Sequence, residues 1–113
     1  MHELAVTKGL LKICLEEGAE YKVKKINKIN IKVGELTDLV PDCISYYFNI
    51  VAKGTIAENT EINVERIPVE INCNECGYKG IIGKNNYICP KCSGMRYEIT
   101  KGREFYLDTM EVD

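Results

Sequence analysis

The sequence predicts an α+β fold in which two helices cover a small three-stranded sheet, with a metal-binding β module inserted before the last strand. Three observations predict it. Two segments carry apolar residues at helical spacing, three segments have the character of strands, and two C-x-x-C pairs stand before the last strand. A chain of 113 residues suits one compact unit or two very small ones, for which a bound metal is a common source of stability.

The chain opens with a predicted helix over residues 3–18. Its apolar positions recur at helical spacing and are Leu4, Leu10, Leu11, Ile13, Cys14 and Leu15. Gly18 is the expected end of this helix. A strand is expected over residues 24–35, where Ile29, Ile31 and Val33 alternate with polar residues, as in a strand with one buried face.

A second helix is predicted from Pro41 to Lys53, because proline is favoured at the first helical position and costs no hydrogen bond there. Its apolar positions are spaced by three and four residues and are Ile44, Tyr47, Phe48 and Val51. Gly54 follows the last of these positions and is placed to cap the C-terminal end of the helix.

Two further strands flank the cysteine segment. The first contains Ile62 and Val64, is interrupted by Pro68 and continues in extended form to Ile71. The second covers residues 103–112. We expect these two flanking segments to pair with each other in the sheet, so that the insert over residues 70–101 has two neighbouring connections.

Four of the six cysteines follow the spacing C-x2-C-x12-C-x2-C and are Cys73, Cys76, Cys89 and Cys92. Two residues between ligands allow a tight turn to direct both sulfurs toward one ion, and two facing turns complete a tetrahedron. Four thiolates leave no open position, which is typical of a structural Zn²⁺ site, and the pattern resembles a zinc ribbon. Gly77 and Gly94 are expected to adopt the unusual backbone angles of the two turns.

Composition and charge narrow the class of protein. The formal net charge of −2 gives no basic surface for nucleic acid. No apolar run approaches the ~20 residues needed to span a bilayer, and the start of the chain lacks the basic stretch and apolar core of a signal peptide. We therefore expect a cytoplasmic protein with no nucleic-acid or membrane partner, whose paired cysteines bind metal rather than form disulfides.

The N-terminus is a second candidate metal site. His2 is the only histidine, and the simpler interpretation is an exposed residue after the start methionine. At this position, however, the Met1 amine, the His2 amide nitrogen and the His2 imidazole can form two fused chelate rings in one plane. A square-planar, nitrogen-rich set suits Ni(II) or Cu(II). Glu3 can add a fourth ligand through its amide or its carboxylate.

Several short motifs, in this order and spacing, together resemble the HypA/HybF family of nickel-insertion accessory proteins for [NiFe] hydrogenase maturation. The motifs are Met1-His2-Glu3, Val33-Gly34-Glu35-Leu36, the turn Ala52-Lys53-Gly54-Thr55, and the two cysteine pairs with their Cys89-Pro90-Lys91-Cys92 sequence. The resemblance covers nearly the whole chain. It implies a nickel-binding domain of two helices on a small mixed sheet, over residues 1–69 and 102–113, with an inserted zinc domain over residues 70–101.

The resemblance also implies the ligands of the nickel site. Nickel is expected at the N-terminus on Met1, His2 and Glu3. Some relatives use an additional acidic side chain in the loop after the Gly-Glu pair, for which Asp38 is the nearest candidate and Asp42 the next. The simpler interpretation of Asp38 is a solvated loop residue or a helix cap.

The function that the resemblance implies is that of a nickel metallochaperone, not an enzyme. Such a protein carries one structural Zn²⁺ and a transported Ni²⁺, and it delivers nickel to the large subunit of [NiFe] hydrogenase. The implied partners are that subunit, a maturation GTPase of the HypB type and, in some organisms, urease maturation factors. The working state is either a monomer or a homodimer.

Two alternatives from other classes remain open on the residues alone. The first is a zinc-ribbon module that binds nucleic acid or a regulatory partner. The second is an iron-bearing electron carrier, since the sequences Cys76-Gly77-Tyr78 and Cys89-Pro90-Lys91-Cys92 resemble those of rubredoxin, although the spacer between them is short for that family. Cys14 and Cys43 lie in the predicted helices, where we expect packing roles.

Overall fold

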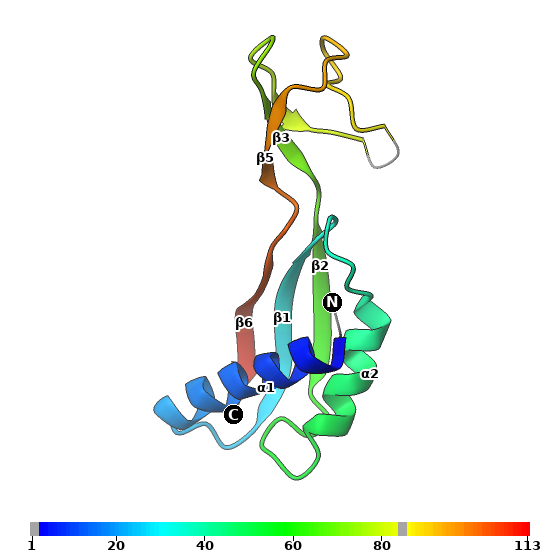
Figure 1. Cartoon of the computed structure of the whole chain (residues 1–113). Coiled ribbons are helices and arrows are strands. Elements are labelled where there is room, and N and C mark those ends of the chain that lie inside the picture. Colours follow the sequence, from blue (N-terminus) through cyan, green and yellow to red (C-terminus); the bar gives the residue numbers. More distant parts are fainter. Residues whose placement is uncertain (1–2, 84–85) are drawn as a thin grey trace. The chain divides into compact units, whose positions relative to one another are not determined.

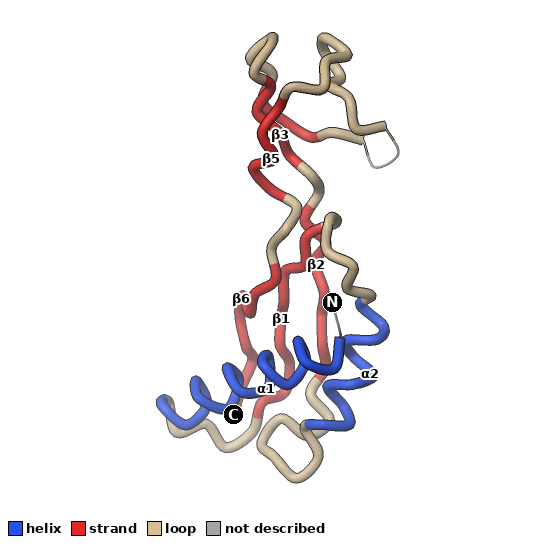
Figure 2. The backbone as a smooth tube through the Cα atoms, viewed as in Figure 1, coloured by secondary structure: helices blue, strands red, loops and turns tan. Residues whose placement is uncertain are grey.

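The computed structural model describes residues 3–83 and 86–113. The elements, in chain order, are α1 (Glu3–Glu20), β1 (Ile26–Gly34), α2 (Pro41–Val51), β2 (Glu61–Ile67), β3 (Glu70–Cys73), β4 (Lys79–Ile81), β5 (Tyr97–Lys101) and β6 (Phe105–Val112) (Figures 1 and 2). The strands form two three-stranded sheets, with the orders β2-β1-β6 and β4-β3-β5. The predicted α+β class and the predicted order of elements are confirmed.

The chain divides into two compact units. The helix–sheet unit comprises Met1–Lys32, Asp38–Glu65 and Phe105–Asp113, and the cysteine unit comprises Val33–Thr37 and Arg66–Glu104. The cysteine unit contains β3, β4 and β5 together with both C-x-x-C pairs. The metal-based domain boundaries given above, and the metal assigned to each domain, stay predictions.

The sheet of the helix–sheet unit is mixed, as cross-strand side-chain pairs indicate. From β1 to β2, Lys28 pairs with Glu61 (3.6 Å) and Lys32 with Glu65 (3.0 Å), so partner numbers rise together and the strands are parallel. Between β1 and β6, Lys28 pairs with Glu111 (3.9 Å) and Asn30 with Thr109 (2.8 Å). The residue number rises along β1 while that of its partner falls along β6, so these two strands are antiparallel.

One topological expectation is wrong. The segments that flank the cysteine insert do not pair with each other, because β1 lies between β2 and β6 and pairs with both. The physical reason is visible in the burial of the central strand. Ile29, Ile31 and Val33 have at most 1 % of their surface exposed, so this strand needs neighbours on both edges and a covering layer on that face. Asn30 and Lys32 occupy the opposite, polar face.

Helix α1 runs two residues beyond Gly18, its predicted end. The residues that it buries also differ from the apolar positions predicted from the sequence. Its buried residues are Thr7, Leu10, Leu11, Cys14 and Gly18, while Leu4 and Ile13 are 40 % and 48 % exposed. Gly18 serves packing, since a Cβ there would lie 2.8 Å from Ile56 Cδ1. The chain turns after the helix at Lys22, which has a positive φ of 55°.

Helix α2 starts at Pro41, as predicted, and ends at Val51. The N-cap residue of α2 is Val40, whose side chain makes no capping hydrogen bond. Asp38 therefore does not occupy the N-cap position. Ile44 and Phe48 are fully buried. Helix α1 packs against α2 and against β6.

Gly34 ends β1 at a point where a side chain cannot fit. A Cβ at Gly34 would overlap the carbonyl group of Gly102 and lie 2.6 Å from the Arg103 nitrogen, all of them backbone atoms. We expect Gly34→Ala to lower the free energy of unfolding by about 1–3 kcal/mol. A matched control is Gly9→Ala in α1, where a Cβ meets nothing within 4 Å and helix propensity should add about 1 kcal/mol. Urea unfolding measures both, and equal midpoints for the two variants would contradict the packing account.

Candidate metal centre

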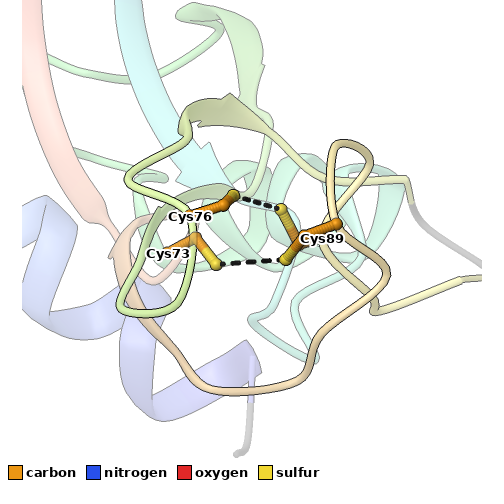
Figure 3. A group of neighbouring side chains, drawn as sticks. Cys73, Cys76 and Cys89 are labelled. Carbon is orange, nitrogen blue, oxygen red and sulfur yellow. Dashed lines mark hydrogen bonds between the residues drawn. The ribbon is translucent and has the colours of Figure 1, made fainter.

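The four cysteines converge on one point in the cysteine unit. Cys73 ends β3, Cys76 lies in the following turn, and Cys89 and Cys92 lie in a second turn ahead of β5. Figure 3 shows the side chains of Cys73, Cys76 and Cys89 directed toward one another. All four sulfurs lie within 4.8 Å of one another, with Cys73 Sγ 3.7 Å from Cys92 Sγ and Cys76 Sγ 3.6 Å from Cys89 Sγ.

These distances fit a tetrahedral metal ion. With Zn–S bonds of about 2.3 Å, the sulfurs of a tetrahedral set lie about 3.8 Å apart. The two shortest sulfur pairs, at 3.7 and 3.6 Å, match that spacing before any ion is placed. Four protein ligands would fill the coordination sphere, so the geometry supports a structural site and leaves no position for a substrate.

The first turn of the site is built from backbone hydrogen bonds that enclose its cysteine pair. The Gly77 N–H donates to the Cys73 carbonyl at 3.1 Å, and the Cys73 N–H donates to the Tyr78 carbonyl at 2.8 Å. Gly77 has a φ of 78°, which confirms the expectation that this glycine provides the left-handed conformation.

The second turn repeats this pattern with one difference. The Ser93 N–H donates to the Cys89 carbonyl at 2.8 Å, and the Cys89 N–H donates to the Gly94 carbonyl at 2.9 Å. The positive φ belongs to Ser93 (61°), so the expectation for Gly94 is wrong. A Cβ at Gly94 would overlap the carboxylate at the end of the exposed Glu75 side chain and lie 3.2 Å from Cys92 Sγ, so the Glu75 side chain uses the space that this glycine leaves.

A small apolar core supports one side of the site. Cys73 and Cys89 are buried together with Val69, Ile71 and Ile82. Half-buried side chains pack around this core, and they include Leu36, Tyr78, Tyr97 and Ile99. Cys76 is half-buried and Cys92 is exposed, so the metal position lies between the core and solvent.

Hydrogen bonding distinguishes the acidities of the cysteines. Burial opposes ionisation of Cys89, but backbone N–H groups of Cys92 and Lys91 favour the thiolate and lower the pKa of Cys89 to about 7. At Cys92, a hydrogen bond from the Gly94 N–H favours the thiolate, yet partial desolvation of the sulfur and the neighbouring thiols raise its pKa to about 12. The neighbouring thiols thus oppose ionisation at Cys92, and a bound cation would favour the charged form.

The predicted nickel ligands are placed only in part. Met1 and His2 lie outside the described residues. Glu3 is half-buried as the first residue of α1 and borders a surface hollow of about 410 Å³ that Lys8 and Tyr47 also line. Asp38 is exposed in the segment between β1 and α2. Within residues 3–83 and 86–113, the cysteine cluster is the one group of three or more candidate ligands close enough to share an ion.

Cys14 packs inside the helix–sheet unit, as expected, with no exposed surface. Burial raises the pKa of its thiol to about 11, although a backbone hydrogen bond acts in the opposite direction. Because alkylation requires an accessible thiolate, we expect Cys14 to resist iodoacetamide in the folded protein and to react fully in urea. Peptide mass spectrometry measures this, and rapid labelling under native conditions would contradict the buried position.

No helix in the described part of the chain combines the length and the apolar character needed to cross a membrane.

The chain is similar to proteins of hydrogenase maturation over its whole length. The family model described as "Hydrogenase/urease nickel incorporation, metallochaperone, hypA" matches residues 1–112. A relative from Dehalococcoides mccartyi, named hydrogenase maturation factor HypA, is 37% identical over 113 residues, which cover 100% of this chain and 95% of the relative. A Methanocaldococcus jannaschii protein of the same name is 36% identical over 121 residues, covering 100% and 98% of the two chains.

Two solved structures share the fold. The solution structure of the Ni metallochaperone HypA from Helicobacter pylori superposes with a TM-score of 0.71 at 23% identity, covering 99% of this chain and 97% of that one. A second solution structure, titled HypA protein, gives a TM-score of 0.74 at 22% identity, with coverage of 99% and 96%.

The match of the family model to residues 1–112 favours the nickel-carrier hypothesis over the two alternatives. The chain therefore belongs to the HypA family of metallochaperones for nickel incorporation, and it is an accessory protein of hydrogenase maturation rather than an enzyme.

Proposed function

We propose that this protein binds Ni(II) at its N-terminus and delivers it to the large subunit of a [NiFe] hydrogenase, while the cysteine cluster holds a structural Zn²⁺. The observation that carries the proposal is the family match, which begins at residue 1 and so includes the Met1-His2-Glu3 sequence. The name of the family describes nickel incorporation, and the chain offers one nitrogen-rich chelating sequence with the only histidine it contains.

The proposed nickel ligands are the Met1 amine, the amide nitrogen and imidazole of His2, and Glu3. Glu3 is the first residue of α1 and borders an open hollow, so its carboxylate is available to an ion at this end of the helix. The negative side chain is also favourable there, because the N-terminal end of a helix carries partial positive charge. Asp38 is a further proposed ligand, supported by its exposed carboxylate and by the absence of a capping role at α2.

Zinc is the proposed ion of the cysteine cluster. Tetrahedral sites with four thiolates bind zinc or iron, and zinc suits a site with a purely structural role. The ion would join the turns before β4 and before β5, which otherwise depend on a small apolar core. We accordingly propose residues 70–101 as the zinc domain and residues 1–69 with 102–113 as the nickel-binding domain.

The proposed partners are the hydrogenase large subunit and a maturation GTPase of the HypB type, with urease maturation factors as further partners, in the cytoplasm. The sequence contains no G-x-x-x-x-G-K-[ST] phosphate loop of its own. Any nucleotide-driven step in nickel delivery must therefore be supplied by another protein. A monomer or a homodimer is compatible with this role.

An extended N-terminus tests the proposal. Adding Gly-Ser before Met1 converts the terminal amine into an amide and moves the free amine away from His2. We expect the zinc-loaded native protein to bind one nickel ion per chain, and the extended protein to bind it at least about tenfold more weakly, because one ligand of a fused chelate is lost. Calorimetric titration measures the affinity. A matched control adds Gly-Ser after Asp113, and undiminished nickel affinity in the N-terminally extended protein would refute the use of the amine.

A further inference from the structure

Thr7 is a polar side chain on the buried side of α1. It has no exposed surface, and among the residues that the structure describes the other buried polar side chain is Thr60, at 4 % exposed. The buried positions that follow Thr7 along the helix are Leu10, Leu11 and Cys14. A buried hydroxyl costs free energy unless it makes a hydrogen bond, and threonine is a weaker helix former than alanine or leucine. The stability of α1 therefore does not account for a hydroxyl at this position.

The Thr7 hydroxyl acts on the first residue of α1. Thr7 Oγ1 donates to the Glu3 carbonyl at 2.5 Å. In an α-helix the same carbonyl is the acceptor for the backbone N–H four residues later, so it receives two donors from one buried residue. Helix ends are held by few hydrogen bonds and open readily. Through Thr7, the first turn is attached to a buried position by a side chain as well as by its backbone.

The other buried threonine makes a different kind of contact. Thr60 Oγ1 donates to the Ile26 carbonyl at 2.7 Å, which joins segments 34 residues apart in the sequence. The Thr7 bond stays within one helix and brings no distant segments together. The two threonines are therefore alike in burial and differ in what their hydroxyls hold, which makes them a matched pair for experiment.

Glu3, the residue that Thr7 holds, belongs to the proposed nickel site. Its side chain borders the hollow that Lys8 and Tyr47 also line. Its N–H has no acceptor inside the helix, because it belongs to the first turn. The amide and the carboxylate are thus both open to an ion. A ligand that is already held in place loses less conformational freedom when the metal binds, so nickel affinity should rise with the order of Glu3.

We propose that Thr7 is a positioning residue for nickel: its buried hydroxyl holds the backbone of Glu3 in the first turn of α1 and so raises the affinity of the N-terminus for Ni(II). The inference rests on the proposed function and adds to it a residue that touches no metal ion. The sequence Met1-His2-Glu3 does not indicate this role, because Thr7 stands one helical turn further along the chain.

Replacing the hydroxyl with a methyl group tests the proposal. Thr7→Val keeps the shape of the side chain and removes the donor, while the Glu3 carbonyl keeps its backbone partner. We expect the nickel affinity of the zinc-loaded full chain to fall about three- to tenfold, with a urea midpoint at or above the native value. Thr7→Ser keeps the donor and should bind nickel within about twofold of the native protein, although the lost methyl lowers its urea midpoint. A purely structural role would instead make affinity and stability fall together.

Hydrogen exchange measures the link between Thr7 and the first turn. The N–H of residue 7 reports opening of this turn, because its helical acceptor is the Glu3 carbonyl. Its protection factor should be lower in nickel-free Thr7→Val than in the nickel-free native protein. Thr7→Ala, which adds no methyl beside the carbonyl, should weaken nickel binding as Thr7→Val does. Thr60→Val is the matched control and should lower the urea midpoint while leaving nickel affinity and protection at residue 7 unchanged.

The outcomes separate this inference from the proposed function. Equal nickel affinity of the native protein, Thr7→Val and Thr7→Ala would overturn the inference and leave the N-terminal site in place. Loss of affinity in Thr7→Ser as large as in Thr7→Val would also overturn it, because the hydroxyl would then have no role. No nickel binding by the native protein, or equal binding by His2→Ala, would overturn the proposed nickel site and this inference with it.

Discussion

Replacing His2 with alanine is expected to abolish stoichiometric nickel binding while leaving the bound zinc in place. The imidazole closes the second of two fused chelate rings, so its removal leaves the amine and an amide nitrogen that nickel alone deprotonates poorly. We expect a loss of affinity on the order of a hundredfold or more, beyond the range produced by removing a group that only supports a ligand. Calorimetric titration of nickel into both zinc-loaded proteins measures it.

The same titration, repeated at lower pH, measures the pH dependence of nickel affinity. Nickel binding requires the amine, the amide and the imidazole to lose protons, so affinity should fall as the pH falls. The His2→Ala variant should show no stoichiometric nickel binding at any pH in the series, because it lacks the imidazole that closes the second chelate ring. Circular dichroism of the two proteins should be identical, which separates loss of a ligand from loss of fold. Nickel affinity that survives the substitution unchanged would refute the N-terminal site.

Replacing Cys73 with serine is expected to release the structural metal and unfold the cysteine unit. Cys73 is 3 % exposed, lies 3.7 Å from the Cys92 sulfur and ends the central strand of the β4-β3-β5 sheet. Structural zinc contributes about 10–16 kcal/mol to the folding of zinc-finger peptides, so a small core cannot replace it. We expect substoichiometric zinc in the variant and loss of amide protection in β3 and β5, with helix signal retained.

Cys43→Ser is the matched control for this substitution. Cys43 is half-buried in α2, in the helix–sheet unit, and belongs to no candidate metal group among the described residues. Zinc content measured by elemental analysis should stay at one ion per chain in this variant. Full zinc stoichiometry in Cys73→Ser together with intact protection of β3 would mean that the metal is held elsewhere.

Local periodicity predicted the elements well. The alternation of Ile29, Ile31 and Val33 identified the central strand, because a strand with one buried face has a period of two residues. Pro41 identified the start of α2, and Pro68 the interruption between β2 and β3, because proline lacks an N–H to donate. The cysteine spacing predicted the cluster, since two residues between ligands suffice to place two sulfurs on one ion.

Contacts between distant residues could not be predicted in the same way. The order β2-β1-β6 depends on which strand needs neighbours on both edges, which a single segment does not reveal. Gly18 resembled a helix end, but it is a close contact with Ile56 in the tertiary structure. Gly94 resembled a turn residue, yet Ser93 takes the left-handed angle and Gly94 leaves space for Glu75. Each glycine could satisfy either need, and only the packing decides between them.

The two metal sites differ in what supports them. The cysteine site follows from spacing and is confirmed as a cluster by the geometry of the sulfurs. The nickel ligands depend on the resemblance to the HypA/HybF family, and Met1, His2, Glu3 and Asp38 stay predictions as ligands. The exposure of Ile13 could not be predicted either, because this residue fits the apolar stripe of α1 in the sequence but lies exposed in the structure.

X-ray absorption at the nickel edge tests the central claim most directly. The sample is the zinc-loaded protein with its native N-terminus and one equivalent of nickel. The account predicts a planar set of nitrogen and oxygen ligands that includes one imidazole, with no sulfur in the first coordination shell. Nickel–sulfur bonds would contradict it, because they would place nickel on the cysteine cluster and leave the N-terminus without its proposed role.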